Sequence, residues 1–239
     1  MYVRFYLHVK DKNKILNWSY KYPMYCMIKE LFSDADITDN MLSFGKYKMY
    51  TFSDLYIPHR CSVDKGLLIK SNVVWFDFAS IDESICKSLI YAISQRKNIK
   101  IANLMFVPVG YSILDNKIVD DIVVFKTVSP VVIRSTKLVS GRQRCWELSV
   151  DDDEYKSRLL DNLVSRFETY YGTKINRGNI DILKIYNVKE KGIMIKNTFI
   201  RCAHYYIVIK APREILQFIS EMGLGEKNGM GFGMVRVVA

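Results

Sequence analysis

The sequence Gly223-Leu-Gly-Glu-Lys-Asn-Gly-Met-Gly-Phe-Gly-Met-Val-Arg-Val-Val238 holds five of the 12 glycines within eleven residues and runs directly into an apolar strand pattern. A helical segment, 212–222, leads into it. Because glycine has no Cβ, this loop can take positive φ and come close to a ligand, and its exposed amides would suit phosphate oxygens. A helix C-cap at Gly223 and a tight turn would explain one or two glycines, but not five. The loop therefore predicts a close backbone approach.

The composition limits the classes of protein to which this chain can belong. The chain has 239 residues, 49% of them hydrophobic, which allows one large or two small domains. Its net charge of +10 favours a polyanionic partner, most often nucleic acid. The 16 tyrosines would suit base stacking on single-stranded RNA. An ordinary basic globular protein with tyrosines in its cores is the alternative that composition leaves open.

Several classes are disfavoured. No run approaches the roughly 18 apolar residues of a membrane span. Residues 1–10 alternate like a strand and lack the apolar centre of a signal peptide, so we expect a cytoplasmic protein with no membrane association. The five cysteines are scattered singly and form no CxxC pair, so neither a disulfide framework nor a zinc site is indicated. We expect no metal site and no cofactor.

The first half of the chain alternates strands and helices in one order. In residues 2–10 the apolar side chains fall on one face, and cations and aromatics such as Arg4 and Tyr6 fall on the other. Helical spacing follows, with Pro23 in the first turn. The order β-α-β-β-α-β is the ferredoxin-like pattern. Its elements are predicted at 2–10, 18–32 (helix), 48–57, 66–78, 82–96 (helix) and 99–114, with a polar loop at 33–46.

The second half repeats this order. Four acids, 151–154, suit the N-terminus of a helix electrostatically, so capping is a better interpretation of them than a metal cluster. Elements are predicted at 122–135 (interrupted at Pro130), 151–171 (helix), 180–188, 198–210, 212–222 (helix) and 232–238. We therefore predict an α+β protein with tandem ferredoxin-like (RRM-like) domains, β-α-β-β-α-β twice, at 1–120 and 121–239.

Four segments resemble one family. Tyr50-Thr-Phe-Ser-Asp-Leu55 resembles its FTFS-type strand, Thr127-Val-Ser-Pro-Val-Val-Ile133 its T-L-S-P-I segment, and Leu160-Asp-Asn-Leu-Val-Ser-Arg-Phe167 its helix ending in N-L-x-x-K-Y. The glycine loop matches the signature G-h-G-x5-G-h-G without deviation. The chain is thus similar to the CRISPR-associated repeat-processing endoribonucleases ("Cas six") of the RAMP superfamily, over about 185 residues.

The resemblance implies a specific activity. Such proteins have tandem ferredoxin-like domains, bind the repeat of the precursor CRISPR transcript, and cut it once without metal. The 2′-hydroxyl attacks the adjacent phosphate and leaves a 2′,3′-cyclic phosphate. The implied partners are the repeat RNA and subunits of a CRISPR effector complex, in a prokaryotic cytoplasm, with the chain acting as a monomer or homodimer.

The catalytic residues of the family transfer only in part. The lysine just before the FTFS strand matches Lys48, whereas the position of the family's loop histidine holds Leu42, with Ser43 beside it. An ungapped match places Lys29 at the position of the family's helix tyrosine, and Tyr25 lies one helical turn away. We expect Lys48 and Lys29 to act as cations, with Tyr25 and Ser43 as further polar candidates. A repeat-binding protein that has lost cleavage is the alternative.

RNA contacts are expected from both halves of the chain. The resemblance assigns RNA binding to the glycine loop, with Lys227 and Asn228 at its tip. A basic stretch after the Ser-Pro motif would add phosphate contacts, or else be a solvated loop. The expected RNA-binding residues are Gly223, Gly225, Lys227, Asn228, Gly229, Gly231, Gly233, Arg134, Lys137, Arg142 and Arg144. For His8, His59 and His204, a structural or surface role is favoured over catalysis.

Overall fold

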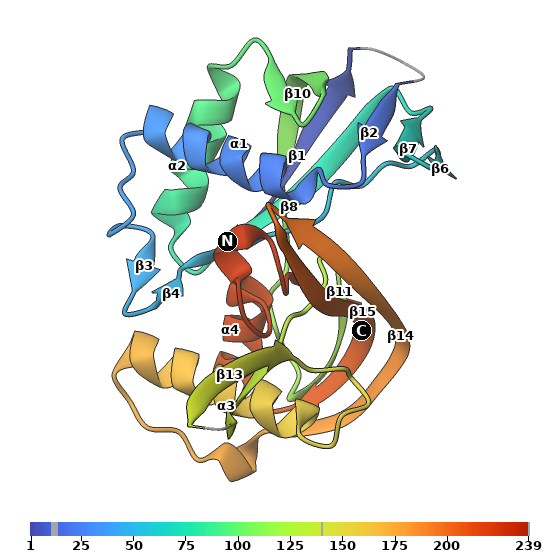
Figure 1. The fold of residues 1–239 in the computed structure, drawn as a ribbon. Coiled ribbons are helices and arrows are strands. Elements are labelled where there is room, and N and C mark those ends of the chain that lie inside the picture. Colours follow the sequence, from blue (N-terminus) through green and yellow to red (C-terminus); the bar gives the residue numbers. More distant parts are fainter. Residues whose placement is uncertain (11–13, 140, 239) are drawn as a thin grey trace.

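The chain folds around two main antiparallel sheets, each covered on one face by two helices (Figure 1). The computed structural model describes residues 1–10, 14–139 and 141–238. In Figure 1 the N-terminal half lies above the C-terminal half. A long hairpin, β14 (Asp181–Ile195) with β15 (Thr198–Lys210), rises from the lower half toward the upper one. This hairpin brings the two halves together on one side of the molecule.

The first sheet is built around its N-terminal strand. In spatial order it contains β5 (Tyr50–Phe52), β8 (Val73–Ser80), β1 (Tyr2–Val9), β10 (Leu104–Leu114) and β9 (Ile99–Ile101). Strand β1 is central because Val3, Phe5 and Leu7 alternate inward and are fully buried beneath α1 (Lys21–Asp34) and α2 (Glu83–Ser94). Fully burying each such side chain contributes about 1.5–3 kcal/mol.

The first half departs from the sequence prediction in its connections. The strand predicted at 66–78 is two strands: β7 (Gly66–Ile69) joins a small sheet with β2 (Ile15–Asn17) and β6 (Arg60–Val63), and β8 then enters the main sheet. Of the strand predicted at 48–57, only β5 and a bridge at Tyr56 pair with β8, and Lys48 belongs to β4. Within the predicted loop 33–46, α1 continues to Asp34, and β3 (Ser43–Phe44) pairs with β4 (Tyr47–Lys48).

The second sheet repeats the plan. Its spatial order is β14, β15, β11 (Ile122–Thr127) and β16 (Val235–Val237), and α3 (Tyr155–Tyr171) and α4 (Arg213–Met222) pack on it. A separate hairpin joins β12 (Arg134–Val139) to β13 (Arg142–Glu147). Short 3-10 turns occur at η1 (Arg177–Asn179) and η2 (Asn228–Met230).

Several boundaries differ in this half. The strand predicted at 122–135 ends as β11 at Thr127, and the strand predicted at 232–238 is the shorter β16. Helix α3 begins at Tyr155, four residues later than predicted, because the acids 151–154 form a preceding turn in which Asp152 accepts a hydrogen bond from the Ser149 amide. Strand β14 extends seven residues beyond the predicted end at residue 188, because its hairpin partner β15 continues to pair with it past a bulge near Asn187.

The fold class is confirmed. In both main sheets the four strands of the β-α-β-β-α-β motif lie in the order second, third, first, fourth, so the chain has tandem ferredoxin-like domains. The division at residue 120 stays a prediction; Ile118 already packs in the second core. Within the described ranges, no helix combines the length and apolar character needed to cross a bilayer.

Candidate functional site

The glycine loop packs against the first domain. A Cβ placed on Gly229 would lie 2.6 Å from Cγ of Lys48, and one on Gly231 would lie 2.3 Å from the Phe52 ring. These glycines therefore let the loop come against β4 and β5. The predicted approach to a ligand stays a prediction, because the close approach seen here is to another part of the same chain. The expectation that the loop amides are freely exposed is wrong, because most of residues 223–234 are buried.

The loop also closes on itself. Gly233 has φ of 74°, and a Cβ there would lie 1.8 Å from the carbonyl oxygen of Leu224. The side-chain amide of Asn228 donates to the carbonyl oxygens of Leu224 (3.1 Å) and Phe232 (3.2 Å). Asn228 is only 7% exposed, because the tip of the loop folds inward as η2. Lys227 is half-buried and lines a pocket.

A buried arginine holds the start of this loop. Arg166 of α3 is 1% exposed, and its guanidinium donates to the carbonyl oxygens of Met222 (2.6 Å), Gly223 (3.0 Å) and Gly225 (3.3 Å). Burial lowers the pKa of Arg166 to about 10. In the sequence, Arg166 stands within the segment that resembles the family's helix, and no separate role was predicted for it. Its signal is a cation placed between the buried helix positions Leu163 and Phe167.

A cluster of two lysines, an aspartate and a serine lies beside the loop. Lys29 of α1 lies 2.5 Å (Nζ) from Oδ1 of Asp39, and Lys48 of β4 lies 3.3 Å from the same oxygen. The Lys48 ammonium also donates to Oγ of Ser43 (2.8 Å), which in turn donates to the Asp39 carbonyl oxygen (2.7 Å). Three of the four predicted catalytic residues are thus brought together. We call Lys29, Asp39, Ser43 and Lys48 the lysine cluster.

Asp39 is the member that sequence reasoning missed. It lies in the predicted polar loop between two cationic positions, which is the signal that could have found it. Its hydrogen bond with Lys29 and the neighbouring Lys48 lower the pKa of Asp39, although partial burial opposes them. The carboxylate therefore stays ionised and orders both ammonium groups. Leu42 is 1% exposed and packs in the first core, so this position offers no side chain to the cluster.

The fourth predicted catalytic residue lies apart from these bonds. Tyr25 is half-buried, and its ring centroid lies 6.1 Å from that of Tyr22. Together they line a pocket of about 450 Å³ between α1, the tip of the β14–β15 hairpin and the glycine loop. Tyr25 therefore borders a cavity next to the lysine cluster.

The basic stretch lies on the β12–β13 hairpin, so the alternative of a solvated loop is wrong. Arg142 and Arg144 are exposed on β13, and Lys137 lies in β12, its side chain outside the part that the structure describes. Arg134 pairs with Glu226 (2.5 Å), which ties the hairpin to the glycine loop. An RNA-binding role for these residues stays a prediction.

A cleft of about 930 Å³ separates the open faces of the two domains. Its aromatic side chains include Tyr56, stacked on Trp75 with centroids 4.3 Å apart, and Tyr206, with the Lys126 ammonium 5.5 Å from its ring. The cations lining it are Arg4, Arg60, Lys126, Lys189, Lys191 and Arg236. Sequence reasoning expected Arg4 on an open sheet face but missed the rest, because they come from strands and connections in both domains.

An ion network crosses between the domains at the end of this cleft. Asp54 accepts from Lys21 (2.5 Å) and lies 3.3 Å from Nε2 of His204, whose Nδ1 is 3.2 Å from Oγ1 of Thr127. Burial acts to raise the pKa of Asp54, but the Lys21 ammonium and the His204 ring outweigh it and lower that pKa. His204 thus bridges the domains. In the described ranges, no group of three or more His, Cys, Asp and Glu side chains could hold a metal ion.

Stability should depend on pH through Asp54. Its folded pKa is lowered, so as pH falls the unfolded chain takes up the proton first, near its usual value of about 3.9. The stabilisation is therefore full above that pH and is lost as pH falls, by up to about 1.4 kcal/mol per pH unit. We expect the difference in unfolding free energy between the native protein and Asp54→Asn to shrink from pH 5 to pH 3 in urea titrations. A constant difference would contradict this linkage.

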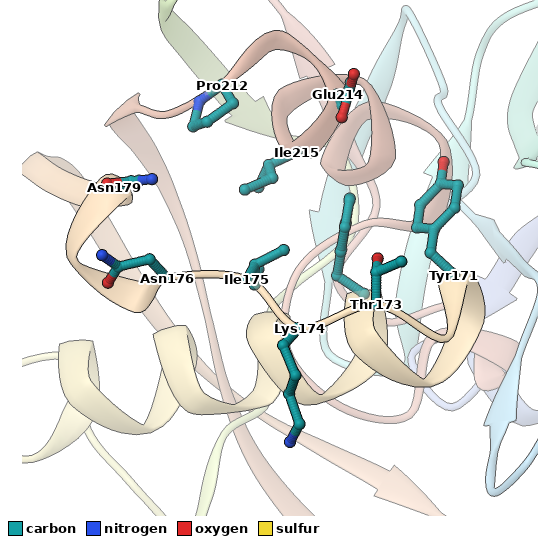
Figure 2. Close-up of a pocket in the computed structure, with 10 residues that line it drawn as sticks. Tyr171, Thr173, Lys174, Ile175, Asn176, Asn179, Pro212, Glu214 and Ile215 are labelled. Atoms are coloured by element: carbon teal, nitrogen blue, oxygen red, sulfur yellow. The ribbon is translucent and has the colours of Figure 1, made fainter.

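A second hollow lies away from these features. It has a volume of about 470 Å³ between the end of α3 and the start of α4, with Ile175 and Ile215 turned toward it and Lys174 turned away (Figure 2). The glycine loop follows the other end of α4, a helix of ten residues and so about 15 Å long. This hollow therefore plays no part in the site described above.

The comparisons with known proteins agree with this architecture. The model of the family described as CRISPR associated protein Cas6, C-terminal, matches residues 114–237. The putative CRISPR-associated endoribonuclease-like protein Cas6nc of Pyrococcus horikoshii is 30% identical over 235 residues, 97% of each chain. The CRISPR-associated endoribonuclease Cas6 1 of Methanocaldococcus jannaschii is 24% identical over 195 residues, 81% of this chain and 75% of that one. A structure titled "An RAMP protein binding different RNA substrates" superposes with a TM-score of 0.89 at 28% identity, covering 100% of both chains.

The two ferredoxin-like domains, with the glycine loop of the second packed against the first, form the fold of a RAMP protein. With the family match over more than half its length and a relative of 30% identity along nearly all of it, the chain belongs to the Cas6 family.

Proposed function

We propose that this chain is an endoribonuclease of CRISPR RNA maturation. It binds the repeat of the precursor transcript and cuts it once, without metal, by attack of a 2′-hydroxyl on the adjacent phosphate. The names of its relatives support the endoribonuclease class. The first domain, 1–120, supplies the lysine cluster, and the second, 121–239, supplies the glycine loop. The setting would be a prokaryotic cytoplasm.

The observation that carries the proposal is the contact between the lysine cluster and the glycine loop. Lys48 touches Gly229 and also bonds to Asp39 and Ser43. RNA held at the loop would therefore present its backbone to two ammonium groups that the Asp39 carboxylate has already ordered. Such preorganisation fixes the geometry of attack before the reaction begins.

The cluster suits a reaction in which charge builds on phosphorus oxygens. O2′ bonds to phosphorus and loses its proton, while the P–O5′ bond breaks and O5′ gains a proton. The products are a 2′,3′-cyclic phosphate and a 5′-hydroxyl. Lys48 is the cation that stabilises the pentavalent phosphorane, and Lys29 is the second cation. Ser43 orients Lys48 by accepting its hydrogen bond.

The cleft between the domains supports binding of the rest of the repeat. Its cations would neutralise phosphates, and its exposed aromatic faces would stack bases without regard to sequence. Single-stranded RNA fits this combination better than a duplex, whose bases are already stacked. The affinity should accordingly fall as salt rises.

A second candidate function has its own support. The position of the family's loop histidine holds a buried leucine, Leu42, and Tyr25 faces a neighbouring pocket. A chain that binds the repeat without cutting it, and hands it to a CRISPR effector complex, would tolerate both features. We favour the enzyme because the lysine cluster is formed and accessible, with Lys48 one-third exposed.

One assay separates the two functions. The protein is incubated with its own repeat RNA in EDTA, and both binding and cleavage are measured. We expect a single cut, a 5′ fragment ending in a cyclic phosphate, and a 3′ fragment beginning with a 5′-hydroxyl. Tight binding with no cut would overturn the enzyme and favour the binding protein.

A further inference from the structure

The pocket bordered by Tyr25 is lined by side chains that take no part in the lysine cluster. Its floor is apolar, formed by Ile195, Ile200 and Met230, and one wall carries the rings of Tyr22 and Tyr25. Its volume of about 450 Å³ falls in the range of small-molecule pockets, about 300–1,000 Å³. The pocket therefore has the size and lining for a flat aromatic ligand.

Two lysines stand at the rim of this pocket. The Lys196 ammonium lies 5.2 Å from the Tyr22 ring, and Lys196 itself sits in the exposed turn between β14 and β15. Lys227 reaches the pocket from the glycine loop. An apolar floor, aromatic walls and cations at the mouth suit a nucleobase whose attached phosphates remain outside.

The pocket shares α1 with the lysine cluster, and the glycine loop that lines the pocket contacts that cluster. Tyr25 and Lys29 are one turn apart on α1, and residues so spaced are neighbours on the helix surface. Gly229, between Lys227 and Met230, contacts Lys48. A nucleotide bound in the pocket would therefore have its phosphate close to the lysine cluster.

We propose that this pocket holds an unstacked nucleobase of the nucleotide next to the scissile phosphate. The inference rests on the proposed function, because it places a cut at the lysine cluster. In a stacked strand the 2′-hydroxyl is not in line with the P–O5′ bond, so turning one base out into a pocket helps to set the geometry of attack. The pocket would thus position the substrate. Its ligand is one base of a single-stranded RNA.

The test couples a pocket substitution to removal of one base. A series of repeat RNAs, each with one abasic nucleotide, is compared with intact RNA for binding to the native protein and to Tyr22→Leu, which keeps apolar packing and removes the ring. All RNAs carry a 2′-deoxy at the scissile nucleotide, or at every nucleotide near the 3′ end if no cut is found. Tyr91→Leu is the control, because Tyr91 is 62% exposed on α2.

We expect one abasic position to weaken binding to the native protein about tenfold, the equivalent of a base–aromatic stack of about 1.4 kcal/mol. Tyr22→Leu should abolish that penalty, whereas Tyr91→Leu should keep it. The sensitive position should adjoin the cut mapped with unmodified RNA. The proposal would be overturned if the effects of Tyr22→Leu and of base removal were additive at every position. It would also be overturned if the sensitive position lay far from the cut. Coupling without any cut would keep a base pocket but overturn both its place beside a scissile phosphate and the proposed function.

Discussion

Lys48→Ala is expected to slow cleavage of the repeat RNA by about 10²–10³-fold, the usual loss when one group that stabilises transition-state charge is removed. The affinity of the Lys48→Ala protein for the RNA should fall by less than tenfold, because one phosphate contact among many is a small part of binding. The measurement is single-turnover cleavage at saturating protein, alongside a binding titration with uncleavable RNA.

The matched control is Lys46→Ala. Lys46 is exposed two residues away, and its ammonium lies over the Tyr47 ring outside the lysine cluster. The Lys46→Ala protein should cleave the RNA at nearly the native rate. Because Lys48 makes only partly exposed ion pairs, worth about 0–1 kcal/mol, neither variant should change the unfolding midpoint much. Equal losses of rate and affinity in Lys48→Ala would mean that Lys48 only holds RNA.

Arg166→Met is expected to lower the free energy of unfolding by about 3 kcal/mol or more. The substitution keeps much of the side-chain volume but leaves the carbonyl oxygens of Met222, Gly223 and Gly225 without their buried donor. Hydrogen bonds to a charged group contribute about 1.5–3 kcal/mol each, and a buried acceptor left without a partner costs its desolvation. Because these carbonyls begin the glycine loop, RNA affinity should fall as well.

Urea titration of Arg166→Met against Arg158→Met measures this effect. Arg158 lies on the same helix but is exposed and pairs with Glu154 one turn away, so its loss should cost less than about 1 kcal/mol. Equal stabilities of the two variants would contradict the role assigned to Arg166.

The fold was predictable where side-chain periodicity and strand pairing coincide. Alternation in residues 2–10 identified the central strand, and the helical stripes identified all four helices to within a few residues. The interval 66–78 was misjudged because alternation cannot say which sheet a strand joins: β7 pairs with β2, and β8 with β1. The end of β14 was missed because its outer part is largely exposed, so no apolar pattern marks it.

The site was predictable only in its parts. The resemblance pointed to Lys29, Lys48 and Ser43, and the structure brings them together. Asp39 and Arg166 act through contacts that no local pattern carries, because their partners are set by tertiary packing. The clustered glycines indicated a close approach to a ligand, and the periodicity of the sequence could not show that they also pack against the first domain. Here Gly229 and Gly231 admit Lys48 and Phe52.

The resemblance assigned RNA binding to the glycine loop and the catalytic roles to residues in the first half of the chain. Their contact at Gly229 and Lys48 makes them adjoining parts of one site. An RNA that reaches the loop is therefore already beside the cations that would cut it.

Two repeat RNAs that differ only in the 2′-hydroxyl of the scissile nucleotide provide the most direct measurement. Both are incubated with the protein in EDTA and, in parallel, without EDTA, and binding and cleavage are followed together. We predict that the unmodified RNA is cut once to a 2′,3′-cyclic phosphate and that the 2′-deoxy RNA binds with similar affinity and stays intact. Cleavage of the 2′-deoxy RNA, or cleavage that EDTA abolishes, would contradict metal-independent attack by the 2′-hydroxyl.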